Sequence, residues 1–143
     1  MDVNEPAIIV SEQPNDADRK AILDALVAFN EKTGGPSGFH PVAILIQDPA
    51  SGKTMGGLWG RIGYDWLFVE LLVIPEGFRG QDLGTRILTQ AEDIARKHNC
   101  LGAWLDTFAF QAPGFYKKLG YEIFGTIEDH PRGLRRFFLK KNF

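Results

Sequence analysis

The nine residues from Trp66 to Ile74 constrain the fold more than any other part of the chain. They form an almost uninterrupted apolar run, with the single carboxylate Glu70 inside it. A run this apolar is typical of a strand that is buried on both faces in the middle of a sheet. A glycine-containing loop follows, and then an amphipathic helix with apolar residues at helical spacing from Leu83 to Ala95. This strand–loop–helix unit predicts an α/β fold.

Shorter elements lie on both sides of this unit. The pattern predicts helices over about 16–32 and 112–119, the first packing by its apolar stripe, and strands over 7–10, 41–46, 54–61, 102–108, 121–127 and 134–140. The element order predicts a mixed α/β sheet, of the α+β type, with about seven strands, antiparallel hairpins at both ends and flanking helices. No break in composition divides the 143 residues, so we expect one domain over residues 1–143.

The loop before the long helix has the features of an anion-binding site. Gly80 and Gly84 have no Cβ and permit close backbone approach, while Arg79 adds a positive charge. The N–H groups at the start of a helix attract phosphate. A strand-to-helix turn that needs glycine only for its shape is the competing interpretation. The spacing matches neither the dinucleotide-binding fingerprint nor the P-loop, so both of those sites are excluded.

Two motifs resemble those of the GNAT superfamily of acetyl-CoA-dependent N-acetyltransferases. The first resembles the family signature Arg/Gln-x-x-Gly-x-Gly/Ala and reads Arg79-Gly80-Gln81-Asp82-Leu83-Gly84, with Asp82 where the family usually has glycine. The second matches the family's aromatic short helix completely and reads Phe115-Tyr116-Lys117-Lys118-Leu119-Gly120-Tyr121. A helix and a strand separate the two motifs, as in the family, and the element order fits over nearly the whole chain.

This resemblance implies a GNAT-like sheet with a V-shaped opening between its two central strands, here residues 67–74 and 103–108. The pantetheine arm of acetyl-CoA would enter the opening, and its pyrophosphate would bind the backbone amides that begin the long helix. The cofactor-binding residues expected on this basis are Leu72, Val73, Ile74, Arg79, Gly80, Gln81, Asp82, Leu83, Gly84, Thr85 and Gln111. Asp82 places a carboxylate beside phosphates, which is unfavourable unless its side chain faces solvent or caps the helix.

Acetyl transfer to an amine needs a base for the ammonium and an acid for the departing thiolate. Tyr116 matches the family's usual acid. Glu70 is the leading base, because burial in an apolar strand would raise its pKa toward the useful range, and Asp106 is the alternative base. A structural role for Glu70 stays open.

The remaining polar and aromatic residues are weaker candidates for the site. Aromatic residues near strand ends, such as Phe108 and Phe110, are more often part of the core. Among the histidines, His40 and His130 sit beside prolines in turns and are expected to be solvated.

The composition excludes several classes of function. One cysteine, Cys100, permits no internal disulfide, and three scattered histidines match no zinc-site spacing, so we expect no metal. A net charge of −2 disfavours nucleic-acid binding, and the longest apolar run is too short to cross a membrane. The N-terminus carries no export signal, which predicts a cytoplasmic protein.

We therefore expect an N-acetyltransferase that moves an acetyl group from acetyl-CoA directly to a primary amine, as a monomer or homodimer. The amine can belong to a small molecule or a peptide, and an antibiotic, a polyamine, an amino acid and a protein all stay open. The competing hypothesis is a non-catalytic acyl-CoA-binding or sensory module on the same fold.

Overall fold

The computed structural model describes residues 4–143, which form two compact units, one ending at Ser37 and one spanning Gly38–Phe143. Residues 1–3, the start of the segment expected to carry no export signal, lie outside the described residues. Within the described part, no helix is long and apolar enough to cross a lipid bilayer.

The first unit contains one helix, α1, over Asp16–Gly34. The side chain of Asn15 caps it by accepting a 2.9 Å hydrogen bond from the Asp18 N–H, and Gly35 with φ 83° ends it. None of residues 16–34 is buried, so the apolar stripe that we expected to pack is exposed.

The strand predicted over residues 7–10 is wrong. These four described residues have no regular structure, and Ile8 is 93% exposed. The run is short and lies between Pro6 and Pro14, and a strand persists only where it pairs with a neighbour. Apolar composition alone does not supply a partner.

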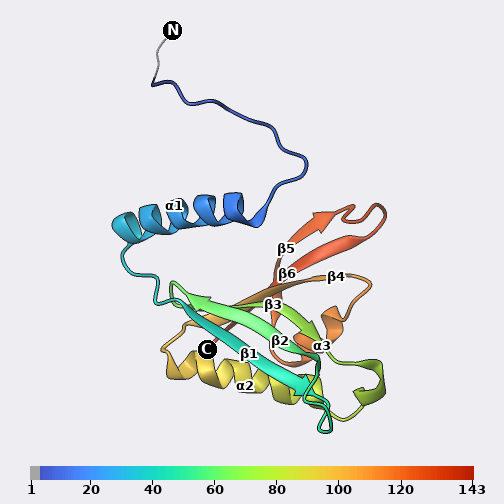
Figure 1. The fold of residues 1–143 in the computed structure, drawn as a ribbon. Helices are drawn as coiled ribbons and strands as arrows, with labels where there is room; N and C mark the ends of the chain where they lie inside the picture. Colours follow the sequence, from blue (N-terminus) through green and yellow to red (C-terminus); the bar gives the residue numbers. More distant parts are fainter. Residues whose placement is uncertain (1–3) are drawn as a thin grey trace. The chain divides into compact units, whose positions relative to one another are not determined.

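The second unit is built on a mixed sheet with the order β1-β2-β3-β4-β6-β5 (Figure 1). The described residues form these six strands rather than the seven expected, because the N-terminal strand does not form. The pairs β1–β2, β2–β3, β4–β6 and β5–β6 are antiparallel, and β3–β4 is parallel. The bounds are β1 His40–Gln47, β2 Thr54–Gly63, β3 Trp66–Val73, β4 Gly102–Phe108, β5 Glu122–Glu128 and β6 Arg135–Asn142.

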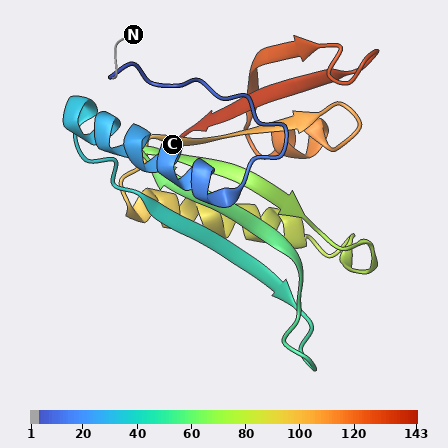
Figure 2. The same ribbon diagram turned by 45° about the horizontal axis from the view of Figure 1, so that its top comes forward.

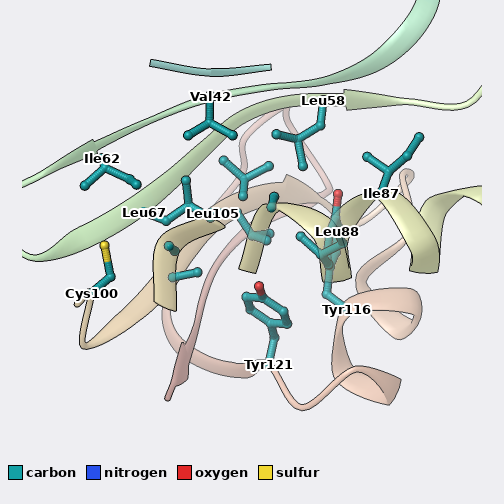
Figure 3. Close-up of a cluster of buried hydrophobic side chains, with 14 of the residues drawn as sticks. Val42, Leu58, Ile62, Leu67, Ile87, Leu88, Cys100, Leu105, Tyr116 and Tyr121 are labelled. Atoms are coloured by element: carbon teal, nitrogen blue, oxygen red, sulfur yellow. The ribbon is translucent and has the colours of Figure 1, made fainter. Parts of the chain in front are cut away.

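Three helical segments complete this unit: η1 over Glu76–Phe78, α2 over Leu83–Lys97 and α3 over Pro113–Lys118. The apolar stripe of α2 contacts β1 to β4. Figure 3 shows side chains from the sheet, such as Val42 and Leu58, together with Ile87 and Leu88 of α2. β3 lies in mid-sheet as predicted, but its buried residues alternate with partly or fully exposed ones, so it is not buried on both faces.

A buried polar network ties α2 to the C-terminal half of the sheet. Glu92 on α2 is 4% exposed, accepts a 2.7 Å hydrogen bond from the Tyr121 hydroxyl and lies 3.0 Å from the Lys141 ammonium on β6. Burial, and next the hydrogen bond to Glu92, raise the pKa of Tyr121. Tyr121 directly follows α3 and its turn, so this network anchors α2, α3 and β6 together.

Replacing Glu92 tests this network. Glu92→Gln keeps the shape but places an amide beside the Lys141 ammonium, so we expect the free energy of unfolding to fall by about 1–3 kcal/mol. Urea denaturation measures the change. The control Glu122→Gln, on an exposed residue of β5, should change it by less than about 0.5 kcal/mol. Equal effects of the two substitutions would contradict the network's structural role.

Candidate active site

The site begins where β3 and β4 stop pairing. Their parallel register covers only Trp66–Val69 against Gly102–Leu105, although β3 continues to Val73 and β4 to Phe108. The two strands then diverge toward their C-terminal ends (Figure 2). β3 stays paired with β2 as far as Val73, so it remains extended while its edge toward β4 has no partner on that strand. The separation lies where the resemblance noted in the sequence implied an opening.

A cavity of about 710 Å³ lies in this part of the molecule. Every expected cofactor-binding residue except Gln81 lines it, as does Tyr116. Phe78, Phe110, Ala112 and Phe115 also line it, and we did not predict them as site residues. Two sequence motifs far apart in the chain therefore meet in one cavity.

The loop before α2 and the first residues of that helix line the cavity. Gly80 has φ 82° and Asp82 has φ 58°, two left-handed residues that turn the chain into α2. The Arg86 N–H donates the first helical bond, 3.0 Å to the Asp82 carbonyl. The N–H groups of residues 83–85 precede it, and such groups have no partner within a helix. The start of α2 therefore offers backbone N–H groups beside the cavity.

Gly84 serves packing as well as access. A Cβ there would lie 3.1 Å from Cζ of Phe115 on α3, so the missing side chain lets α3 approach the start of α2 closely. From the sequence we considered ligand approach and the shape of the turn as the reasons for these glycines, and did not foresee the packing of α3 on Gly84. At Gly80 the shape of the turn is the reason, since a Cβ there would meet nothing within 4 Å and its positive φ favours glycine.

Arg79 and Asp82, the two charged residues of the loop before α2, play different parts in it. The Arg79 Nε donates a 3.3 Å hydrogen bond to the Ile74 carbonyl, which fastens the loop to the end of β3. Asp82 is exposed, and its side chain makes no capping hydrogen bond to α2. Of the two arrangements considered for Asp82, the structure has the solvent-facing one.

Tyr116 on α3 is a buried phenol in the cavity wall. It is 9% exposed, and its ring meets the rings of Phe115 and Tyr121 edge-on. Burial, and next the charge of Asp106, raise its pKa to about 12. The phenol is therefore protonated at neutral pH and can act as a hydrogen-bond donor or an acid.

The expectation that Glu70 is buried is wrong. Its side chain is 45% exposed and lies 3.4 Å from Nη1 of Arg61. The register explains this, because Trp59 pairs with Leu71 and Gly60 with Val69, so Glu70 is the unpaired residue of a β-bulge. Alternation resumes after the bulge, and the carboxylate points away from the core.

Asp106 occupies the matching position on β4. Glu70 and Asp106 each directly follow the last pair of the β3–β4 register, Val69 with Leu105. Arg136 on β6 donates from Nε to Oδ1 of Asp106 at 2.9 Å. Neither carboxylate lines the cavity. Both flank the point where the strands separate.

Gln111 fixes the segment between β4 and α3. Its Oε1 accepts hydrogen bonds from the Phe108 N–H at 2.8 Å and from the Thr107 hydroxyl at 3.1 Å. Phe110, beside it, is 61% exposed. We expected aromatic residues near strand ends to be part of the core. Only the turn-forming composition of this segment indicates that Phe110 is exposed.

Comparisons with known proteins agree with this geometry. A family model described as the acetyltransferase (GNAT) family matches residues 10–121. The acetyltransferase Atu2258 of Agrobacterium fabrum is 35% identical over 135 residues, which cover 94% of this chain and 98% of that protein. The blasticidin-S acetyltransferase of Streptomyces morookaense is 42% identical over 91 residues, which cover 63% of this chain and 67% of that protein.

The fold of this chain is also similar to that of a solved acetyltransferase structure. That structure is of a protein described as an acetyltransferase, from Agrobacterium tumefaciens, with a TM-score of 0.91 and 33% identity. The match covers 96% of this chain and 100% of that chain. The similarity thus extends over both described units of the sequence.

Proposed function

The chain belongs to the GNAT family of acetyltransferases, and from this premise we propose that it moves an acetyl group from acetyl-CoA directly to a primary amine. One observation carries the proposal. The cavity beside the separated strands is lined both by the loop that begins α2 and by the protonated phenol of Tyr116. Anion binding and a proton donor therefore meet in one space, as acetyl transfer from a phosphate-bearing thioester requires.

The residues present fit acetyl-CoA. The N–H groups of residues 83–85 suit its pyrophosphate. Beyond Val69, the edge of β3 that faces β4 has backbone groups without a β4 partner, and these suit the amides of a pantetheine arm. When bound, acetyl-CoA supplies an activated thioester, and every other contribution comes from the chain's own residues.

Tyr116 is the proposed donor to the leaving sulfur. A thiol has a pKa near 8.5, so a phenol with a pKa of about 12 holds its proton more tightly than a thiol does. Full transfer from Tyr116 is therefore uphill. We assign Tyr116 to stabilising the developing thiolate by a hydrogen bond. The neutral amine becomes positively charged when its nitrogen bonds to the carbonyl carbon, and the proton that this nitrogen then loses is acidic enough to protonate the departing thiolate.

Glu70 is the proposed base, with Asp106 as the alternative. An amine attacks only as the neutral species, so a proton must leave it first. Glu70 sits at the bulge beside the strand separation and is exposed enough to act through water. Asp106 is equally placed, but Arg136 holds one of its oxygens at 2.9 Å. By contrast, Arg61 lies farther, 3.4 Å, from the nearest oxygen of Glu70. Cys100 is buried and does not line the cavity, which agrees with direct transfer without an acyl-enzyme.

The acceptor is proposed to be a small-molecule or peptide amine. The relative from Streptomyces morookaense is named for blasticidin-S, which makes that compound the first acceptor to assay. The competing hypothesis, a module that binds acyl-CoA without catalysis, predicts binding of acetyl-CoA but no release of the CoA thiol. An assay of thiol release with mixed amines separates the two.

Binding of acetyl-CoA is tested by two opposite substitutions in the loop. Gly84→Glu should abolish binding measured by calorimetry, because it adds a negative charge and collides with Phe115. Asp82→Gly should preserve or tighten binding, since it removes a carboxylate near phosphates and relieves a φ of 58°. Weaker binding by Asp82→Gly would show that the carboxylate contributes to the site, and no binding by the parent protein would remove the proposal.

The role of Tyr116 is tested by Tyr116→Phe. Loss of the phenol should lower kcat by about 10²–10⁴-fold with little change in acetyl-CoA affinity. The raised pKa keeps Tyr116 protonated at every pH below about 12, so a basic limb seen below pH 10 should persist in the variant. An unchanged kcat would assign Tyr116 to packing only.

The base is identified from the pH dependence of kcat/KM. A base must be deprotonated, so activity falls as the pH falls through its pKa, and Glu70→Gln should remove this acidic limb. Asp106→Asn should keep it. The reverse result exchanges the two roles, and an acidic limb retained by both variants excludes both carboxylates. Each variant is first shown to bind acetyl-CoA.

A further inference from the structure

Three rings near the C-terminal end of β4 form a cluster that the proposed reaction does not use. Phe108 and Phe110 stack with ring centroids 5.1 Å apart and planes 8° from parallel. His130, in the loop between β5 and β6, meets Phe108 edge-on at 5.2 Å. We call Phe108, Phe110 and His130 the aromatic shelf.

Phe110 presents an open ring to the site. It lines the cavity together with Tyr116, yet it is 61% exposed. Phe108 stacks on it, so Phe110 is the outer member of a parallel pair. A flat ring that is backed by a second ring and open to a cavity is a platform for a third planar group.

Arg136 holds Phe108 of the aromatic shelf in place. The guanidinium of Arg136 lies 5.1 Å from the ring centroid of Phe108, and its Nε is hydrogen-bonded to Asp106. Asp106 directly follows the last β3–β4 pair. A platform fixed in this way loses little conformational freedom when a ligand stacks on it.

One polar atom of the aromatic shelf lacks a partner. Nδ1 of His130 is buried and has no hydrogen bond among the described residues. Buried polar atoms are rarely left unsatisfied in native proteins, and the exceptions gather where a ligand or water completes the site. The cluster therefore combines apolar stacking surface with an unmet polar requirement.

We propose that the aromatic shelf binds a planar unsaturated ring of the acceptor, stacked on Phe110, and so selects amines that carry an aromatic or heteroaromatic group. The inference rests on the proposed function, because it places the acceptor beside Tyr116. Most of the expected cofactor contacts come from the end of β3, the loop that follows it and the start of α2, whereas the aromatic shelf comes from β4, the segment after it and the β5–β6 loop. Only Gln111, an expected cofactor contact, adjoins the aromatic shelf at Phe110.

Two amines of equal carbon skeleton test the proposal. 2-Phenylethylamine and 2-cyclohexylethylamine differ only in whether the ring is planar and unsaturated. Their affinities are measured by calorimetry on the protein with and without saturating CoA, which cannot transfer an acetyl group. Stacking should make 2-phenylethylamine bind about two- to tenfold more tightly. Phe110→Leu should bring this ratio to about one, and Phe110→Tyr should retain it.

Controls separate this proposal from the proposed function. Phe124→Leu, on a comparably exposed ring of β5, should leave the ratio unchanged. Failure of the parent protein to bind CoA counts against the proposed function, and the titrations without CoA still decide the stacking question. Equal affinity for the two amines, no binding of 2-phenylethylamine, or a loss confined to CoA binding in Phe110→Leu would each overturn the proposal.

Discussion

The early end of pairing between β3 and β4 is the constraint on which the site depends. Two parallel neighbours share only four register positions and then diverge, leaving backbone groups of mid-sheet strands without a strand partner. Unmade backbone bonds are unfavourable. The arrangement persists because β2 pairs with β3 to Val73 and β6 pairs with β4 to Phe108, so each strand keeps one complete edge. A ligand with amide groups can satisfy the other edge.

Packing and polar contacts join the two helices beside the separated strands. The N-terminus of α2 packs against α3 through the contact of Gly84 with Phe115, and Glu92 further along α2 binds Tyr121 just after α3. These contacts join the two helices to each other and to β6, to which Lys141 adds an ion pair with Glu92. Tyr116 lies between these contacts, and burial raises its pKa to about 12. Structural packing and the protonation state needed for the proposed chemistry have the same origin.

Most of the second unit was predictable because its signals are local. Turn residues and hydrophobic period located all six of its strands, α2 and α3, and the two motifs located the cavity wall. The N-terminal strand was not predictable, since a four-residue apolar run gives no information about a partner. Glu70 was misplaced because an apolar run does not reveal a bulge, which is a property of the register with β2. Phe110 was missed because its exposure depends on how the segment after β4 turns.

Amide hydrogen exchange with and without acetyl-CoA shows whether backbone groups beyond the last β3–β4 pair bind this cosubstrate. Binding there should slow exchange in residues 70–74 and 83–85 and cause little change in the β1–β2 hairpin, which lies on the far side of β3 from β4. Protection confined to other residues, or none at saturating acetyl-CoA, would contradict it.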